Sequence, residues 1–262
     1  MKNIVFTKMV ASGNDFVLVR LKAENRFLRT LARKVCERKF GMGADGLLVL
    51  EKSKCADIKM RIFNADGSEA KMCGNGARCI ALLIGKKKVS IETKTGIIAS
   101  VVSNNNVRIK LTDLKDIKPD IPLKVIRRSM HINFINTGVP HAVIFTEGVD
   151  KFDIIGLARF IRYHKRFAPA GTNVNFVEVL GKDAIKVRTY ERGVEDETLA
   201  CGTGSVASSL VFASKTCAAR KIYVHTKGGE VLKVYFERKN NGFRNIWLEG
   251  RVRIVCKGVY YV

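Results

Sequence analysis

Apolar and polar positions along the chain predict helices of two kinds and several short strands. Residues 27–39 carry apolar side chains at helical spacing beneath a basic outer face, which predicts a surface helix. Residues 74–85 are apolar on nearly every face and therefore predict a buried helix. Short apolar or alternating runs predict strands at 46–52 and 58–64, and a hairpin over 89–102.

The second half of the chain repeats this order of elements. At an offset of 127 residues, IKMRIFN at 58–64 aligns with IKVRTYE at 185–191, and GNDFVLV at 13–19 aligns with PHAVIF at 140–145. Residues 201–214 predict a second buried helix, rich in small side chains. A long period that occurs only twice indicates two pseudo-symmetric domains, because a solenoid stacks many short units.

The repeat predicts an α/β fold in the broad sense, with α+β mixed sheets. Each of the two domains is expected to be a mostly antiparallel sheet wrapped around a buried helix, with the active site in the cleft between the domains. The expected domains are 1–116 and 117–250, and a final strand at 251–262 is expected to complete the N-terminal domain. Residues 113–122 hold two of the four prolines and predict the linker.

Composition restricts the class of protein and its compartment. Hydrophobic residues make up 47% of the 262 residues, as in ordinary globular proteins, and no apolar run approaches the roughly 20 residues of a membrane helix. The first ten residues lack the apolar core of a signal peptide. The seven cysteines are an odd number, which indicates free thiols. We therefore expect a cytoplasmic protein without a membrane partner.

The formal net charge of +23 is compatible with another class of function, a basic nucleic-acid-binding protein, which stays as an alternative. The basic residues are spread over the whole chain, however, and no aromatic-rich basic strand of the kind that stacks bases occurs. Nucleic acid is therefore not the expected partner. The four histidines are scattered and no C-x-x-C pair is present, so no metal site is expected.

Two cysteines stand at equivalent points of the repeat, each in a glycine-rich turn just before a buried helix. They are Cys73, in MCGNGARC, and Cys201, in ACGTGS. Unpaired N–H groups and the helix dipole at a helix N-terminus stabilise negative charge, and both thiols are therefore expected to have a lowered pKa. The remaining cysteines are expected to be structural: Cys36, Cys55, Cys79, Cys217 and Cys256.

A thiolate and a thiol on opposite sides of one carbon can invert a stereocentre by proton transfer. A substrate carboxylate held between the two turns would meet the main-chain N–H groups of Gly74 and Asn75 on one side and of Gly202 and Thr203 on the other. One sulfur would remove the α-proton and the other would return a proton on the opposite face. The helix N-termini would stabilise the charge that spreads onto the carboxylate.

These turns resemble the two cysteine motifs of the diaminopimelate epimerase family, cofactor-independent enzymes that interconvert LL- and meso-diaminopimelate. Further segments are similar to the family in the same order along nearly the whole chain: SGNDF at 12–16, GADGLL at 43–48, RIFNADGSE at 61–69, GVPHAV at 138–143, GTNVNFV at 171–177 and YERGVEDET at 190–198. The resemblance implies an isomerase of lysine and peptidoglycan precursor biosynthesis that uses no cofactor.

The resemblance also implies roles for individual residues. It makes Cys73 and Cys201 the two bases, with His141 and Glu191 as accessory groups near them. Arg192 would bind the distal carboxylate of the substrate, and Glu191 would accept from its distal ammonium. The implied partner is the small molecule diaminopimelate, and a homodimer is compatible with the sequence. The residues implied to hold the substrate are Asn14, Asn64, Asn173, Glu191 and Arg192.

Two positions depart from the family pattern. Some members have glutamine where Gly46 stands, and many have asparagine where Val139 stands, which puts the side-chain contacts at both places in doubt. A proline racemase or hydroxyproline epimerase is the nearest alternative, and its cyclic substrate has no distal carboxylate for Arg192. The related isomerase fold used in phenazine synthesis is a further alternative, against which the two matched cysteines argue.

Overall fold

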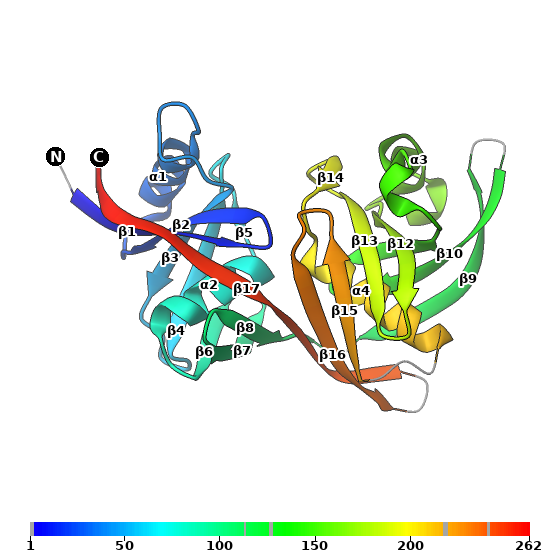
Figure 1. The fold of residues 1–262 in the computed structure, drawn as a ribbon. Helices are drawn as coiled ribbons and strands as arrows, with labels where there is room; N and C mark the ends of the chain where they lie inside the picture. The colour runs from blue at the N-terminus through cyan, green and yellow to red at the C-terminus, as the bar shows by residue number, and fades with distance from the viewer. Residues whose placement is uncertain (1–2, 113, 126–127, 217–219, 240–241) are drawn as a thin grey trace. The chain divides into compact units, whose positions relative to one another are not determined.

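A computed structural model describes residues 3–112, 114–125, 128–216, 220–239 and 242–262 (Figure 1). Its contacts divide the chain into two units, the first made of Met1–Lys110 and Glu249–Val262 and the second of Leu111–Leu248. The chain therefore leaves the first unit once and returns to it near the C-terminus. Within the described ranges, every helix is too short or too polar to cross a membrane.

The first unit is a mixed sheet with two helices. The strand pairs β2–β3 and β4–β6 are parallel, and the pairs β1–β2, β3–β4, β6–β7 and β7–β8 are antiparallel. The elements are β1 (Asn3–Ala11), β2 (Asn14–Arg20), α1 (Asn25–Cys36), β3 (Gly46–Glu51), β4 (Ile58–Asn64), β5 (Glu69–Ala70), α2 (Gly74–Ile84), β6 (Lys88–Thr93), β7 (Gly96–Ser103) and β8 (Asn106–Lys110).

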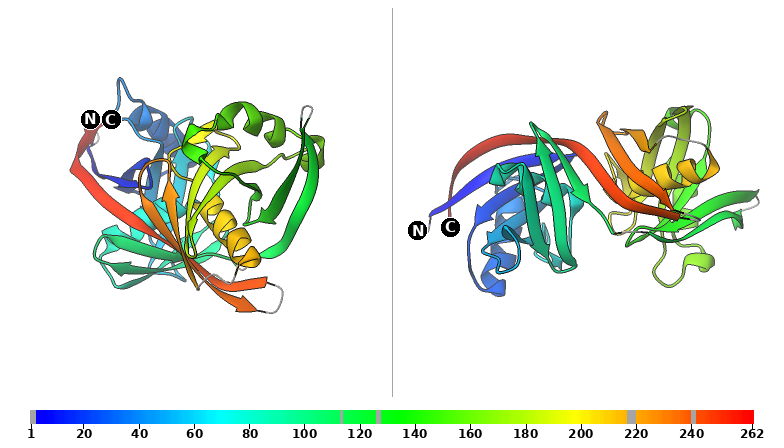
Figure 2. Two further views of the ribbon diagram at one scale, coloured as in Figure 1. Left: turned by 45° about the vertical axis from the view of Figure 1, so that its right-hand side comes forward. Right: turned by 90° about the horizontal axis from the view of Figure 1, so that it is seen from below.

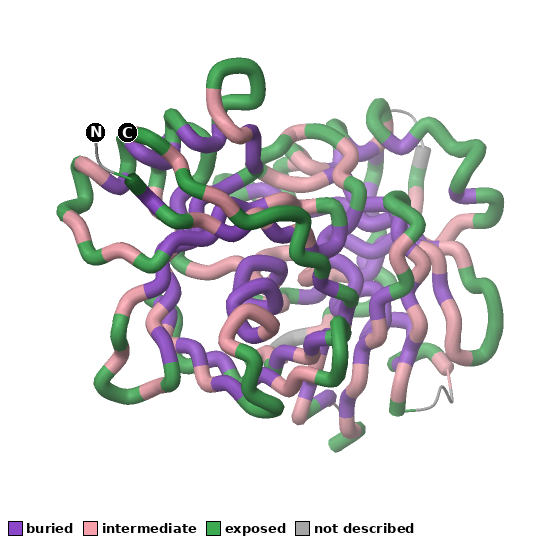
Figure 3. The backbone as a smooth tube through the Cα atoms, turned by 60° about the vertical axis from the view of Figure 1, so that its left-hand side comes forward, coloured by how far each residue is buried: buried purple, intermediate pink, exposed green. Residues whose placement is uncertain are grey.

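The two helices of the first unit lie on opposite faces of the sheet. Successive residues of a strand point to opposite faces, and here Leu47 packs in the same core as the buried side of α1, whereas Leu48 lies against Gly76 of α2. Helix α1 is amphipathic and exposes its basic face, but α2 is buried over most of its length. The burial of α2 explains why its sequence is apolar on nearly every side (Figure 3).

The last strand, β17 (Gly242–Tyr261), returns the chain to the first unit. It pairs antiparallel with β1, from Asn3 opposite Tyr261 to Ala11 opposite Val252. This pairing gives the first strand of the chain a second neighbour besides β2.

The second unit repeats the plan of the first. Its parallel pairs, β11–β12 and β13–β15, stand where β2–β3 and β4–β6 stand in the first unit. The elements are β9 (Lys115–Val125), β10 (Arg128–Asn136), β11 (Pro140–Phe145), η1 (Val149–Lys151), α3 (Ile154–Arg162), η2 (Lys165–Phe167), β12 (Asn173–Gly181), β13 (Ala184–Glu191), β14 (Asp196–Thr198), α4 (Gly202–Lys215), β15 (Lys221–Thr226) and β16 (Val231–Lys239).

Helices α3 and α4 also lie on opposite faces of their sheet. Val174 and Phe176 of β12 share a hydrophobic core with α3, and Asn175 between them lies against Gly204 of α4. Figure 2 shows the ribbons of the two helices on either side of this sheet. Helix α4 is almost completely buried from Gly204 to Ala213.

The predicted fold class is confirmed, and two local expectations are wrong. The helix expected over 27–39 ends at Cys36, where Glu37 leaves the helical conformation. The linker expected at 113–122 falls largely on β9, which pairs with β10. Prolines are tolerated in a strand where their missing N–H is not needed by the ladder, so their presence in β9 did not require a linker. Of the cysteines expected to be structural, Cys217 lies outside the described residues.

Candidate active site

Cys73 begins helix α2 in the first unit. Its backbone is extended, its side chain is half-buried, and its sulfur accepts a hydrogen bond from the main-chain N–H of Gly76 at 3.4 Å. Gly76 allows close packing here, because an added Cβ would lie 2.9 Å from a methyl carbon of Leu48. The turn therefore lets the helix pack closely on β3 while its first N–H groups, on Gly74 and Asn75, remain at the helix N-terminus.

Cys201 begins helix α4 in the second unit with the same local geometry. Its sulfur accepts from the N–H of Gly204 at 3.4 Å and lies 3.4 Å from the hydroxyl oxygen of Thr203. Cys201 as a whole is only 5% exposed. A Cβ at Gly204 would lie 2.3 Å from Oδ1 of Asn175, so this glycine too is required by close packing.

The expected lowering of the thiol pKa is wrong for Cys201. Burial, followed by the charge of Glu191, raises the pKa of Cys201 to about 12. The hydrogen bonds from Thr203 and Gly204 act in the expected direction, but they do not outweigh the loss of hydration. A pKa of about 12 favours the protonated thiol of Cys201 at neutral pH.

Glu191 is the last residue of β13, and His141 lies in β11. Burial raises the pKa of the Glu191 carboxyl, and the neighbouring Thr198 and Cys201 side chains partly offset this effect. His141 is completely buried, and burial together with the charge of Arg192 lowers its pKa to about 3. The imidazole is thus uncharged at neutral pH.

Asn175 decides which nitrogen of His141 carries the proton. Its Oδ1 accepts from the hydroxyl of Thr189 at 3.0 Å, and its Nδ2 donates to the carbonyl oxygen of Ala142 at 3.0 Å. This places Nδ2 3.1 Å from Nδ1 of His141, so Nδ1 is the acceptor and Nε2 bears the hydrogen. The sequence analysis missed Asn175, although a polar residue inside the apolar run NVNFV was a signal for it.

Asn173 and Arg192 are brought together at one end of the second unit. Asn173 donates to the carbonyl oxygen of Pro140 at 3.0 Å and accepts from the main-chain N–H of Arg192 at 2.8 Å. The guanidinium of Arg192 donates through Nη1 to the carbonyl oxygen of Ala170 at 3.2 Å. The amide of Asn173 thus fixes the turn that carries Arg192.

Asn14 and Asn75 meet in the first unit, whereas Asn64 makes a separate turn contact. Nδ2 of Asn75 donates to Oδ1 of Asn14 at 2.6 Å. Nδ2 of Asn64 donates to the hydroxyl of Ser68 at 2.9 Å, inside the turn that follows β4. Asn64 is exposed, so its side chain is accessible despite this bond.

The two positions that depart from the family pattern have structural uses of their own. Gly46 is buried in β3, where a Cβ would lie 3.0 Å from the carbonyl oxygen of Phe63. The carbonyl oxygen of Val139 accepts from the N–H of Thr137 at 3.0 Å in the turn between β10 and β11.

Within the described ranges, no group of three or more His, Cys, Asp or Glu side chains is arranged to hold a metal ion.

Solved structures with the same fold define the class of protein. The chain matches a phenazine biosynthesis protein of the PhzF family from Bacillus anthracis with a TM-score of 0.75 at 17% identity, covering 100% of both chains. It matches a probable proline racemase from Agrobacterium radiobacter K84 with a TM-score of 0.72 at 14% identity, covering 99% of this chain and 92% of the other. The chain therefore has the two-unit fold of the PhzF and proline racemase type.

Sequence comparison narrows this class to one family. A sequence model of diaminopimelate epimerase matches residues 6–114 and 133–255, and the chain belongs to the diaminopimelate epimerase family. The diaminopimelate epimerase of Aquifex aeolicus is 41% identical over 97% of this chain and 96% of its own length. That of Archaeoglobus fulgidus is 44% identical over 88% and 89%. The family inferred from the cysteine motifs is thereby confirmed.

Proposed function

We propose that this chain epimerises LL-2,6-diaminopimelate to meso-diaminopimelate by a two-base mechanism, without pyridoxal phosphate. One observation carries the proposal: in each repeat a cysteine begins a buried helix, and its sulfur accepts a hydrogen bond from the second glycine N–H of the turn at 3.4 Å. Membership of the diaminopimelate epimerase family supports the choice of substrate. The product is a precursor of lysine and of peptidoglycan.

The reaction exchanges one proton at the α-carbon. A thiolate takes the α-proton as the C–H bond breaks, and the electron pair spreads into the adjacent carboxylate. The main-chain N–H groups of Gly74, Asn75, Gly202 and Thr203 are proposed to bind that carboxylate, where the helix N-termini stabilise the added charge. A thiol then delivers its proton to the opposite face of the carbon. The scheme requires both sulfur atoms to reach the same α-carbon.

Burial supports one choice of the starting proton distribution. Because the pKa of Cys201 is about 12, its thiol is the proton donor in the turnover from LL- to meso-diaminopimelate, and Cys73 is the base. When that turnover is complete, the transferred proton lies on Cys73 and the negative charge on Cys201. The reverse reaction starts from this second distribution, so each sulfur serves as donor in one direction and as base in the other.

The accessory residues act on Cys201 and on the distal half of the substrate. The raised pKa of Glu191 and its proximity to Cys201 suit it to hold or release a proton beside that sulfur. His141 is uncharged, so we assign it a hydrogen-bonding role. We propose that Arg192 binds the distal carboxylate, that Glu191 accepts from the distal ammonium, and that the side chains of Asn14, Asn64 and Asn173 complete the contacts.

We further propose that the enzyme acts in the cytoplasm as a homodimer. Exposed apolar side chains on the β1–β17 pair support self-association, since such patches are unusual on a surface that meets only water. Val5 and its register partner Val259 are 72% and 44% exposed, and Tyr261 is 65% exposed. Sedimentation of the wild type and of a Val259→Asp variant tests the assembly, because a buried carboxylate would dissociate it. A wild type that sediments as a monomer excludes the dimer.

Deuterium uptake tests the proposed reaction directly. LL-diaminopimelate incubated with the protein in heavy water should gain deuterium at the α-carbon while meso-diaminopimelate accumulates. A chelator is present and pyridoxal phosphate is omitted, so that neither a metal nor that cofactor contributes. Proline and trans-4-hydroxyproline serve as matched substrates for the alternative racemases. Exchange with either of these and none with diaminopimelate would reject the proposal.

A further inference from the structure

The first turns of helix α2 contain a completely buried guanidinium. Arg78 is 0% exposed and is the largest side chain in the core of the described residues. Burying a charge is costly unless strong hydrogen bonds replace its hydration. Nη2 of Arg78 donates to the hydroxyl of Ser12 and to Oδ1 of Asn75, both at 2.6 Å.

These contacts fix the direction of a chain of hydrogen bonds. Arginine has only donors, so the oxygen of the Asn75 amide must face it, and the Asn75 nitrogen must point away. That nitrogen donates to Oδ1 of Asn14 at 2.6 Å, and Nδ2 of Asn14 then donates to Oδ2 of Asp45 at 3.1 Å. The chain therefore runs from a buried cation to a carboxylate through two amides, each held in one orientation.

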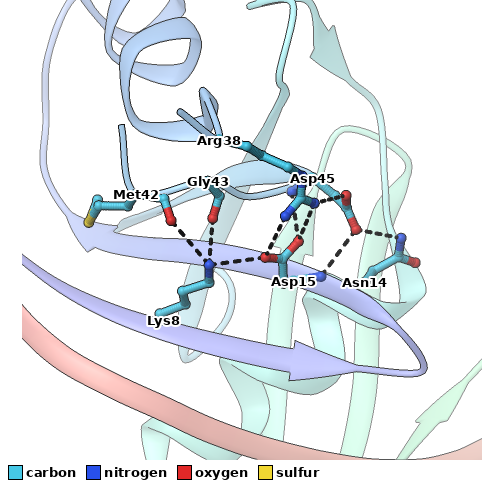
Figure 4. Close-up of polar contacts among 7 residues, drawn as sticks. All are labelled: Lys8, Asn14, Asp15, Arg38, Met42, Gly43 and Asp45. Carbon is cyan, nitrogen blue, oxygen red and sulfur yellow. Dashed lines mark hydrogen bonds and ion pairs between the residues drawn. The ribbon is translucent and has the colours of Figure 1, made fainter. Parts of the chain in front are cut away.

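The Asp45 carboxylate, at the other end of this chain of hydrogen bonds, is itself held in place. Arg38 donates to Oδ1 of Asp45 at 2.8 Å, and Oδ2 of Asp45 also accepts from the main-chain N–H of Asp15 at 3.2 Å (Figure 4). Lys8 and Arg38 both pair with Asp15 beside it, at 3.1 and 3.0 Å. The opposite charges at the two ends polarise every bond between them in the same sense.

Arg78 also holds the turn that precedes Asn14. Ser12 and Gly13 both have positive φ, 52° and 81°, as the two-residue turn of a tight hairpin requires. A positive φ is strained for serine, and Ser12 is buried. Its hydrogen bond to Arg78 joins the β1–β2 turn to helix α2 and is separate from the contact between Asn14 and Asn75.

The repeat indicates that the guanidinium is not needed to build the fold. At the offset of 128 residues that separates Cys73 from Cys201, Arg78 corresponds to Val206, which is completely buried in α4. At the offset of 127 residues found earlier in the repeat, Ser12 corresponds to Val139, and Asn14 to His141. The second copy thus packs the same helix on the same sheet without a cation there. The charge in the first copy has a purpose beyond packing.

We propose that Arg78 is a positioning residue of the first half of the active site, acting through Asn75 on Asn14. This inference rests on the proposed function, which assigns the main-chain N–H of Asn75 and the side chain of Asn14 to the substrate. Both ends of the Asn75 amide are occupied by Arg78 and Asn14. The side chain therefore ties the helix N-terminus to Asn14, and the proposed function assigns the main-chain N–H of Asn75 to the substrate carboxylate.

The test compares Arg78→Met and Arg78→Lys with a matched control, Ser12→Ala. Arg78→Met should lower kcat/KM for LL-diaminopimelate on the order of 10- to 100-fold, mostly through KM, because small misplacements of binding groups cost that much. Arg78→Lys keeps the cation and should recover part of the loss. Ser12→Ala leaves the Asn75 contact intact and should lower the melting temperature with little change in kcat/KM.

A purely structural Arg78 gives a different pattern. Both Arg78 variants would then melt earlier with unchanged kcat/KM of the folded fraction, as Ser12→Ala does, and the proposal would be wrong. Asp45 lies at the exposed end of the chain of hydrogen bonds, and Asp45→Asn is the second test if Arg78→Met fails to fold. It should raise KM in the same sense, and its effect should not add to that of Arg78→Lys.

Side-chain amide signals separate this inference from the proposed function. In the ligand-free protein, the ¹⁵N–¹H signals of the Asn75 and Asn14 amides should shift together in Arg78→Lys and in Asp45→Asn, and stay in place in Ser12→Ala. Amide signals that do not respond overturn the positioning role, whatever the activity. Absence of α-proton exchange in the wild type rejects the proposed function, whereas linked amide shifts would still support the role of Arg78 in the chain of hydrogen bonds.

Discussion

Cys73 and Cys201 share a local geometry but differ in their surroundings. Both are in extended conformation before a helix, and both sulfur atoms accept one N–H at 3.4 Å. Cys73 is half-buried, whereas Cys201 is 5% exposed and lies near the carboxyl of Glu191. At the residue scale, burial therefore outweighs the helix N-terminus in deciding the ionisation of Cys201.

Replacing either cysteine by alanine should abolish epimerisation. In the proposed mechanism each variant loses one of the two groups that move a proton, and such a loss typically lowers kcat by about 10²- to 10⁴-fold. Progress curves with LL-diaminopimelate measure the effect, and Cys55→Ala, at an exposed thiol, is the control. Circular dichroism shows whether the fold is kept. Substantial activity in Cys73→Ala or Cys201→Ala contradicts the two-base scheme.

His141 should make stability depend on pH below neutrality. Its pKa is about 3 in the folded protein, against an ordinary value of 6.5, so the folded state disfavours the proton. The associated stability is fully present above about pH 6.5 and is lost as the pH falls towards 3, because only the unfolded chain binds the proton readily. The full effect is about 5 kcal/mol in the free energy of unfolding.

Urea unfolding of the wild type and of His141→Gln between pH 7 and pH 4 measures this slope. The glutamine variant keeps a polar side chain but cannot titrate, so its stability should fall less steeply with acid. Parallel slopes would mean that His141 has an ordinary pKa in the folded protein.

At the element scale, alternation along the strands decides which residues reach the two buried helices. Val174 and Phe176 face α3, and Asn175 faces α4. The equivalent position in the first unit is Leu48, which faces α2. One repeat thus places an amide under the cysteine turn where the other places a hydrocarbon, and this difference provides the partner for His141.

Gly204→Ala should be destabilising because helix α4 packs on Asn175 without room for a methyl group. The added Cβ would lie 2.3 Å from Oδ1 of Asn175, and overpacking of this kind costs about 1–3 kcal/mol in the free energy of unfolding. Gly181→Ala is the matched control, since a Cβ there meets nothing within 4 Å. Chemical denaturation measures both. Equal stability of the two variants would show that α4 can shift without cost.

At the scale of the whole molecule, the second unit is inserted between two parts of the first. Residues 1–110 and 249–262 form one unit, and the pairing of β1 with β17 joins its ends. The first unit is therefore completed only after the entire second unit has been made.

A chain ending at Leu248 should lose order in the first unit alone. It lacks the part of β17 that pairs with β1, so the amides of β1 and β2 should lose protection from hydrogen exchange. Strands β12 and β13 should keep theirs, because their partners all lie in the second unit. A chain lacking only Val262 is the control. Uniform loss of protection in the shorter chain would mean that the two units unfold together.

Much of the fold was readable from the sequence because the signals are local. The buried helices follow from apolar residues on every face, and the strands from alternation, since both depend on spacings of a few residues. The prolines of β9 led to a wrong prediction of a linker, because a proline interrupts a strand only where its N–H is required. Whether that N–H is required depends on how β9 pairs with β10, and the residues next to each proline do not encode this pairing.

The family, the duplicated fold and the two thiols at helix N-termini could be read from the residues alone, because each is carried by a short motif or by the repeat. The folded arrangement was needed to find the raised pKa of Cys201, the neutral His141 held by Asn175, and the link from Arg78 to Asp45. Burial and hydrogen-bond partners depend on residues far apart in the chain, and hydration is lost only when those residues pack together.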